Sequence, residues 1–403
     1  MSDLAINGGK PVFATPLEPI LWPPVYEETA EELKKLYLGH NWSFYGEQEV
    51  KFNEEFAAYT GAEECVMMAN GTVTLEVALK ALGVGKGDEV IVPAHSWLAT
   101  GEAVVYCQAT PVIVDIEPDT LCLDPEAMEK AITPKTKAVI PVHLFGSMAD
   151  MDKICAIAKK YNLYVIEDCA HSHGGLWDGK HTGTLGDVGS FSFQQSKLMA
   201  SGEGGACITN NSELADKMGR LSHIGYQFGS KQGQKGTPPP KGMICYNYRV
   251  TDFQALILRS QLAHLDEDTA LRAAGAEFLR ENLNTIPGIR VQSPGRKATR
   301  QNYYTFCIMV DPAKLKPGID RAKVVEALNA EGVSVFVGWG QPMYKQNLWT
   351  VPESMYRIES CANAERIVLN ELMMLDLTWL MRSKEVLQQV VDAFRKVMAE
   401  YGC

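Results

Sequence analysis

The sequence predicts an α/β fold, with a large domain on a mostly parallel, seven-stranded sheet and a smaller C-terminal α+β domain. Between about residues 60 and 215, short apolar runs alternate with longer helical patterns, an order typical of a sheet covered by helices. Beyond about residue 260, helical patterns flank a strand-like run. The 403 residues exceed the size at which one hydrophobic core usually stops growing. We therefore expect an N-terminal arm and large domain in residues 1–259 and a small domain in residues 260–403.

Seven apolar runs are expected to form the strands of the large sheet. Their nearly continuous apolar character fits burial on both faces of a parallel sheet. In chain order they are ECVMMA (64–69), DEVIVPA (88–94), TPVIVDI (110–116), KAVIPVHLF (137–145), LYVIEDCA (163–170), GSFSFQ (189–194) and GACITN (205–210).

Helical periodicity predicts the elements that cover this sheet and build the second domain. Apolar residues recur at helical spacing over 72–84 and 150–162 in the first part of the chain. In the second part the same spacing predicts helices over 251–283, 320–333 and 385–402, with a strand over 303–311. Glycine, proline and polar residues over 228–242 predict an exposed excursion, either a lid or an interface arm.

Charge and cysteine usage limit the classes of protein. The formal net charge of −11 argues against a general affinity for nucleic acid or an anionic membrane, because both require a basic face. The ten cysteines lie far apart and include no C-x-x-C pair, so we expect them to be reduced. The N-terminus lacks a signal-peptide pattern and no apolar run is long enough to span a membrane. The predicted location is the cytoplasm.

Three segments carry the chemistry. Asp168 ends an apolar strand in VIEDCAHSHGG, at the edge where parallel sheets usually bind ligands. Gly71 and Thr72 lie between a strand and a helix, and a helix N-terminus binds phosphate. Lys197 follows the strand-like GSFSFQ. Together they favour a phosphorylated cofactor with a ring nitrogen, held covalently by an amine, and pyridoxal phosphate is the obvious candidate.

Simpler interpretations of the same segments stay open. Asn70, Gly71 and Thr72 are also typical of a turn with a helix cap. A metal-dependent hydrolase built on Asp168, His171 and His173 is the rival chemistry, although H-x-H spacing is common and a third or fourth organised ligand would be needed. The expected metal content is none.

Several motifs, in order, resemble the DegT/DnrJ/EryC1/StrS family of fold-type I aminotransferases. They are NGGKPV at Asn7, GAEE, NGT, EDCAHSHGG, GSFSFQQSK, GEGG and YNYRVTDFQAL. The resemblance runs through most of the chain and weakens after about residue 300. It implies a pyridoxal 5'-phosphate-dependent transaminase that acts on keto groups of nucleotide-linked sugars or cyclitols.

The resemblance also implies roles for individual residues. Lys197 is expected to hold the cofactor covalently and later to carry protons between substrate and cofactor. Asp168 is expected to pair with the pyridine nitrogen, Trp97 to stack on the cofactor ring, and His171 to lie near the ring hydroxyl.

The phosphate cradle is likewise expected from the resemblance. Gly71, Thr72 and Ser192 match its positions, and Asn247 in YNYR matches the residue that the neighbouring subunit lends to the phosphate. The resemblance therefore implies a homodimer. His223 and Arg249 are candidates either for substrate contacts or for structural pairing. The excursion 228–242 and the tract FVGWGQPMYKQNLW (336–349) are expected to shape the pocket for the ketone.

A departure from the family pattern points to the acceptor. Gln194 and Gln195 stand in the short run before the lysine, where much of the family has histidine or an aromatic residue. This version resembles the branch that acts on carbocyclic ketones such as scyllo-inosose, with glutamine or glutamate as the amino donor. Nucleotide-linked keto-sugars remain the alternative acceptor, and a non-catalytic regulatory protein on the same fold is the alternative of a different class.

Overall fold

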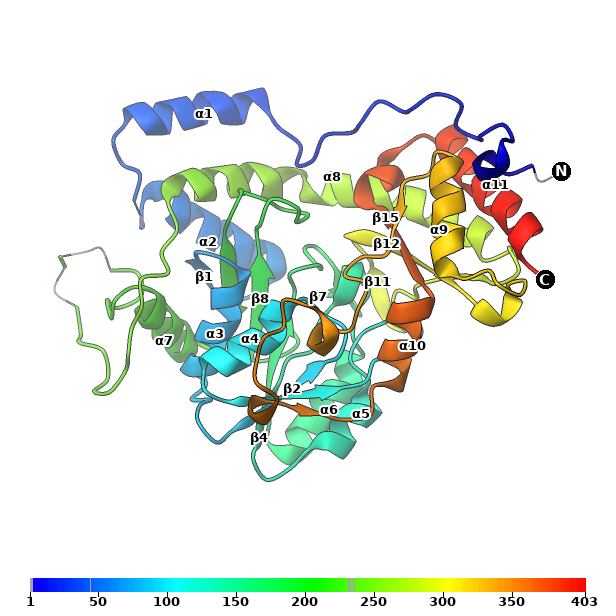
Figure 1. Ribbon diagram of the computed structural model, residues 1–403. Helices are drawn as coiled ribbons and strands as arrows, with labels where there is room; N and C mark the ends of the chain where they lie inside the picture. Colours follow the sequence, from blue (N-terminus) through cyan, green and yellow to red (C-terminus); the bar gives the residue numbers. More distant parts are fainter. Residues whose placement is uncertain (1–2, 44, 231–232, 235) are drawn as a thin grey trace.

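A computed structural model describes residues 3–43, 45–230, 233–234 and 236–403. Its largest feature is an eight-stranded sheet in the order β1-β9-β8-β5-β4-β2-β3-β14 (Figure 1). Every strand but β9 runs in the same direction. The strands are β1 (Glu64–Met68), β2 (Glu89–Pro93), β3 (Thr110–Val114), β4 (Thr136–Val139), β5 (Tyr164–Asp168), β8 (Val188–Ser192), β9 (Gly205–Thr209) and β14 (Arg357–Ile358).

All seven predicted strands are present, and the sheet has an eighth that the sequence analysis did not predict. β14 is two residues long and pairs in parallel with β3. It comes from the C-terminal part of the chain, so nothing in its short sequence marks it as part of this sheet. The central strands are almost fully buried, as their continuous apolar sequences predict.

Helices pack around this sheet and along the second half of the chain. They are α1 (Glu27–Leu38), α2 (Glu47–Thr60), α3 (Gly71–Ala81), α4 (Leu98–Tyr106), α5 (Pro125–Ala131), α6 (Met151–Tyr161), α7 (Ser212–Ser222), α8 (Asp252–Leu283), α9 (Arg321–Ala330), α10 (Ala362–Asn370) and α11 (Lys384–Tyr401). Short 3-10 helices lie at Ala5–Asn7, Leu144–Gly146, Pro312–Lys314, Met343–Lys345, Glu353–Met355 and Leu377–Met381. Several starts follow from local sequence, because the side chains of Asn70, Asp150, Asn211 and Asp320 accept hydrogen bonds from the first backbone N–H groups of their helices.

The C-terminal part contains a second sheet, antiparallel, in the order β10-β12-β15-β13. Its strands are β10 (Ile289–Val291), β12 (Thr305–Val310), β15 (Leu372–Asp376) and β13 (Val335–Phe336). Its core also includes Leu4 and Phe13 from the N-terminus, and Figure 1 shows both chain ends beside α9 and α11. A third small sheet joins β6 (Leu176–Trp177), β7 (Lys180–His181) and β11 (Ala298–Arg300).

The helix α8 connects the two parts. It contributes Ala255, Leu258 and Leu265 to a core shared with the large sheet, and Ala276 and Leu279 to the core around the second sheet. The predicted boundary at 259/260 thus falls inside an unbroken helix, and the division of the chain there stays a prediction. Residues 228–242 form irregular, mostly exposed chain where the structure describes them. None of the described helices combines the length and apolarity needed to cross a bilayer.

Candidate active site

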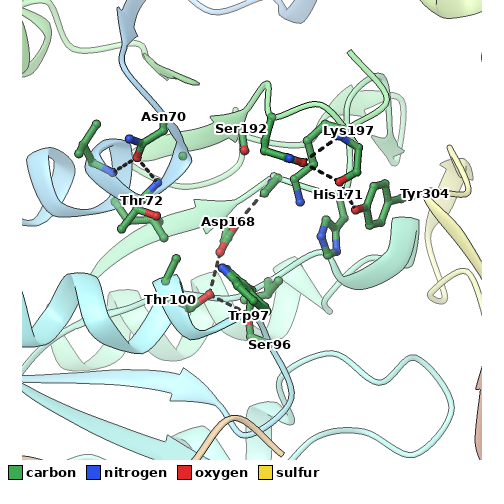
Figure 2. A pocket seen from close by; sticks show the side chains of 18 of the residues that line it. Asn70, Thr72, Ser96, Trp97, Thr100, Asp168, His171, Ser192, Lys197 and Tyr304 are labelled. Atoms are coloured by element: carbon green, nitrogen blue, oxygen red, sulfur yellow. Dashed lines mark hydrogen bonds between the residues drawn. The ribbon is translucent and has the colours of Figure 1, made fainter. Parts of the chain in front are cut away.

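A cavity of about 760 Å³ opens at the carboxyl ends of the parallel strands, the edge where such sheets usually bind ligands. Segments that follow β1, β2, β4, β5 and β8 line most of it, and Tyr304 and Trp339 reach it from the C-terminal part. Seven of the eight predicted site residues line it, namely Gly71, Thr72, Trp97, Asp168, His171, Ser192 and Lys197 (Figure 2). The fold therefore gathers residues that lie up to 126 positions apart in the sequence.

Lys197 lies in the turn after β8 and is partly exposed to the cavity. Its Nζ is 4.8 Å from the centroid of the Tyr304 ring. Burial lowers the pKa of the amine from its ordinary 10.5 to about 8, and the Asp168 carboxylate opposes part of this shift. The indole N–H of Trp22 donates to the backbone carbonyl of Lys197 at 3.0 Å. A fraction of the amine is therefore neutral and nucleophilic near neutral pH.

Asp168, at the end of β5, is buried and fixed by two donors. Its Oδ2 accepts from the Thr100 hydroxyl at 2.9 Å, and its Oδ1 accepts from the Ala170 N–H at 3.2 Å. Burial raises the pKa of Asp168, while those two hydrogen bonds and the positive charge of Lys197 act in the opposite direction. A buried carboxylate with few partners is costly alone, and a cationic ring nitrogen would remove most of that cost.

Thr72, from the predicted phosphate end, lies across the cavity from Lys197, and Ser192 lies between them (Figure 2). A Cβ on Gly71 would come within 2.5 Å of the Ser192 Cβ, so the close approach of these segments requires glycine. The Thr72 amide already donates to Asn70 Oδ1 at 3.1 Å. Both interpretations of Asn-Gly-Thr thus apply, because Asn70 caps α3 while Gly71, Thr72 and Ser192 all border the cavity.

Aromatic side chains form the remaining walls. Trp97 is 45% exposed, and its ring centroid lies 5.8 Å from that of Trp339. His171 is buried and stacks on Tyr304 with 4.1 Å between ring centroids. Its Nδ1 accepts from the Phe145 N–H at 3.4 Å. Burial, with the nearby charge of Lys197, keeps the pKa of His171 well below its usual value, so this imidazole is neutral.

The eighth predicted site residue, Asn247, is not among the residues that line the cavity. It is exposed and forms an isolated antiparallel bridge with His223. Neither His223 nor Arg249 lines the cavity. Both border a separate small pocket together with Tyr45 and Phe228. Their candidate roles, substrate contact or structural pairing, stay predictions.

The rival metal set is not brought together. His173 turns its Nε2 to the Ser192 carbonyl at 2.9 Å. Among the described residues, the group with ligand-like spacing is instead His143, Glu167 and Cys169. The Glu167 carboxylate there accepts hydrogen bonds from His143 and from three backbone amides of the loop 183–186. These hydrogen bonds explain the cluster, because they anchor the loop 183–186 to β5.

Sequence reasoning missed three residues that complete the site: Ser96, Thr100 and Tyr304. Thr100 lies one helical turn after Trp97, so its position near the cavity could have been predicted from the PAHSWLAT segment. Tyr304 gave no such signal, because it enters the cavity from the other part of the chain. Trp339 belongs to the tract 336–349 that was expected to shape the ketone pocket, and it lines the cavity, while its contact with a ketone stays a prediction.

The residues present fit a ligand with a phosphate at one end and a protonated ring nitrogen in the middle. The glycine cradle at Gly71 and Ser192 would be filled by a Cβ, and the buried Asp168 carboxylate needs a cationic partner. Lys197 supplies an amine with a depressed pKa. These are the features that a phosphorylated ring cofactor held through a lysine would require.

Comparison with known proteins gives the family. The model of the DegT/DnrJ/EryC1/StrS aminotransferase family matches residues 24–395, and the chain belongs to that family. An L-glutamine:2-deoxy-scyllo-inosose aminotransferase of Streptoalloteichus tenebrarius is 41% identical over 81% of this chain and 78% of its own length. A putative L-glutamine:3-amino-2,3-dideoxy-scyllo-inosose aminotransferase of Micromonospora echinospora is 36% identical over 99% of this chain and 98% of its own length.

Solved structures agree with this assignment. The crystal structure of 3-amino-5-hydroxybenzoic acid synthase matches with a TM-score of 0.85 and 30% identity, over 96% of this chain and all of that one. An aminotransferase from Psychrobacter cryohalolentis matches with a TM-score of 0.87 and 30% identity, over 96% of this chain and 99% of that one. The predicted fold class and the predicted aminotransferase activity are confirmed.

Proposed function

We propose that the protein uses pyridoxal 5'-phosphate to move an amino group from L-glutamine to the keto group of a polyhydroxylated carbocycle of the scyllo-inosose type. The observation that carries the proposal is the placement of the Lys197 amine and the buried Asp168 carboxylate in one cavity. The names of the two relatives support glutamine and an inosose as substrates. Glutamate is the second candidate donor.

The side chains have distinct tasks in this proposal. When bound, the cofactor supplies the electron sink and carries the amino group between the two substrates. The neutral Nζ of Lys197 accepts the proton from the α-carbon of the donor and delivers a proton to the former keto carbon of the acceptor. Asp168 holds a positive charge at the ring nitrogen, Trp97 covers the ring, and the neutral His171 borders the ring hydroxyl.

The test follows the two substrates separately. Protein loaded with pyridoxal phosphate is mixed with glutamine or glutamate, and the change in cofactor absorbance reports donor use. Scyllo-inosose or a nucleotide-diphosphate keto-sugar is then added, and the aminated product is identified by mass spectrometry. Amination of the inosose, with no product from Lys197→Ala, supports the proposal. Use of the keto-sugar alone would replace the acceptor, and no cofactor absorbance at all would overturn the proposal in favour of a regulatory protein.

A homodimer is part of the proposal, with the partner subunit's Asn247 reaching the phosphate end of the cavity. Two observations support this. Asn247 is exposed in its own chain. Among the described residues that line the cavity, Lys197 is the one that carries an ammonium or guanidinium group. Co-expressing Lys197→Ala with Asn247→Asp tests it. Mixed dimers would restore one intact site each, or about a quarter of wild-type activity if the chains pair at random. Failure to restore activity would remove Asn247 from the site.

The expected cytoplasmic location stays a prediction. The cysteines of the described chain are all unpaired, which is compatible with a reducing compartment.

A further inference from the structure

One side of the cavity holds a chain of hydrogen bonds that the roles described above do not use. Gln194, Ser196 and Tyr304 all line the cavity. The Oε1 of Gln194 lies 2.8 Å from both the backbone N and the Oγ of Ser196. Ser196 Oγ lies 2.9 Å from the hydroxyl of Tyr304. These atoms join a strand-end residue of the large sheet to a residue from the C-terminal part.

The donors and acceptors of these hydrogen bonds follow from which atoms carry a hydrogen. The backbone N–H of Ser196 is only a donor, so the atom that it faces must be the carboxamide oxygen and not the nitrogen. An amide oxygen cannot donate, so the single hydrogen of the Ser196 hydroxyl also goes to Gln194. Ser196 Oγ must then accept from Tyr304. The Gln194 carboxamide is thereby held in one orientation.

This orientation leaves the two N–H donors of Gln194 uncommitted. Among the residues that the structure describes, Nε2 has no hydrogen-bond partner. Tyr304 is itself held, because its ring stacks on the buried His171. A preorganised amide donor in a cavity loses little rotamer freedom when it binds a ligand oxygen.

The charge of the lining indicates which substrate this donor meets. Near Tyr304 the polar lining residues are the neutral Gln194, Ser196 and His171, and the charged residues of the described lining are Lys197, Asp168 and Glu203. Such a lining matches an uncharged polyol ring, whose hydroxyls both donate and accept. It does not match a diphosphate or the α-carboxylate of an amino acid, which would call for cations.

We propose that Gln194 is a specificity-determining residue whose Nε2 donates to a ring hydroxyl of the ketone acceptor, held in place by Ser196 and Tyr304. The inference rests on the proposed function, since it assigns a residue to the acceptor in that reaction. It also gives a physical reason why glutamine stands three residues before the lysine.

Gln194→Leu is the direct variant, because leucine neither donates to nor accepts from a ring hydroxyl. Gln194→Glu is the second variant, since it keeps an oxygen for the Ser196 N–H and can only accept from a ring hydroxyl. Gln195→Leu is the matched control, since Gln195 is exposed and does not line the cavity. The two half-reactions are measured in single turnovers by cofactor absorbance, with glutamine alone and then with scyllo-inosose.

We expect Gln194→Leu to raise the half-saturating concentration of scyllo-inosose about tenfold or more, the size of one hydrogen bond to a polar partner. Gln194→Glu should have a smaller effect, because the ring hydroxyl can donate to the new carboxylate. The glutamine half-reaction should change less than about twofold on the same scale. Tyr304→Phe should weaken inosose binding by a smaller factor, because Ser196 still holds the carboxamide. Across mono-deoxy analogues of the inosose, the Gln194→Leu penalty should disappear for the analogue that lacks the contacted hydroxyl.

The outcomes separate this inference from the function on which it rests. If the wild-type protein does not aminate scyllo-inosose, the proposed function fails. If the wild type does so and Gln194→Leu behaves like Gln195→Leu, only the role of Gln194 is overturned. A penalty confined to the glutamine half-reaction, or one equal for every deoxy analogue, also overturns it.

Discussion

The hydroxyl of Thr100 donates to Oδ2 of Asp168 over 2.9 Å, and the Oγ of Ser96 lies 2.7 Å from the same hydroxyl. Thr100 has one hydrogen to give, so Ser96 must donate to Thr100. This relay orients the carboxylate that we propose to pair with the cofactor ring nitrogen. All three side chains are almost fully buried, so water cannot replace a missing donor easily.

Thr100→Val should therefore lower the transamination rate about tenfold, the cost of one buried hydrogen bond to a charged group. The shape of the side chain is kept, so a loss of packing is not expected. Steady-state kinetics measures the effect, and Thr100→Ser is the control that should recover most of the rate. Equal rates in wild type and Thr100→Val would show that Asp168 does not depend on this donor.

Asp168→Asn should have a larger effect, because it removes the charge itself. We expect at least about a 100-fold loss of rate, as when one electrostatic partner is removed from a preorganised site. Absorbance of the loaded variant checks that cofactor is still bound. A variant that retains near-normal turnover would exclude Asp168 from electron withdrawal.

Lys197 predicts a pH-dependent stability. Its pKa falls from 10.5 to about 8 on folding, so the unfolded chain binds more protons between these values and stability rises with pH there. Below about pH 8 the buried charge is costly in cofactor-free protein. Lys197→Met should then be more stable than wild type at pH 7, on the order of 1–3 kcal/mol. This advantage should shrink as the pH rises through the window.

Thermal unfolding of the cofactor-free proteins at pH 7 and pH 10 measures this difference. Lys86→Met serves as the control at an exposed lysine and should show no comparable change with pH. A difference between Lys197→Met and wild type that is constant with pH would mean that packing, rather than charge burial, distinguishes them.

Gly71→Ala tests the cradle. The new Cβ would meet the Ser192 Cβ at 2.5 Å, so β8 and the start of α3 must move apart. Overpacking of this kind costs about 1–3 kcal/mol, and we expect cofactor affinity to fall about tenfold or more as the cradle opens. Cofactor titration by absorbance is the measurement. Gly85→Ala, where the nearest atom is 3.8 Å away, should leave the affinity unchanged.

Glu331 ties the N-terminus to the C-terminal part. Its buried carboxylate accepts from the backbone N–H groups of Ala5 and Val12 at 2.8 and 3.0 Å and from the Lys396 amine at 2.8 Å. Glu331→Gln should lower the free energy of unfolding by about 2–4 kcal/mol, because the lysine and one amide lose their charged acceptor.

Urea unfolding measures the loss, and hydrogen exchange at the amides of Ala5 and Val12 should accelerate. The exposed Glu326 in α9, the helix that ends just before Glu331, provides the control variant Glu326→Ala, which should change neither. Unchanged exchange in Glu331→Gln would show that apolar contacts alone hold the N-terminal segment.

Much of the site was predictable because its chemistry lies in short local patterns. Each of three features can be recognised from about a dozen consecutive residues. They are the strand that ends at Asp168, the glycine turn at the start of α3 and the lysine after β8. Parallel strands then bring their carboxyl ends to one edge, so their proximity follows from the fold class. Thr100 was within reach of the same reasoning, one helical turn from Trp97.

Tyr304 and the strand β14 were not predictable in this way. Each reaches the large sheet or its cavity from more than 100 residues further along the chain than the segment that it meets. Their local sequences look like ordinary loop or core residues. Their positions are set by packing between segments that are distant in the sequence. The hydrophobic periodicity of a single segment does not report such packing.

Local sequence patterns account for the α/β architecture, the seven main strands and most of the candidate site residues, because apolar strand runs, helix caps and strand-end carboxylates can be recognised from a few consecutive residues. The neighbours that set the pKa of Lys197, the donors that hold Asp168 and the continuity of α8 across the expected domain boundary emerged from the tertiary structure alone. Those features depend on burial and on hydrogen bonds between distant segments. Desolvation acts on a side chain only after the whole chain has closed around it.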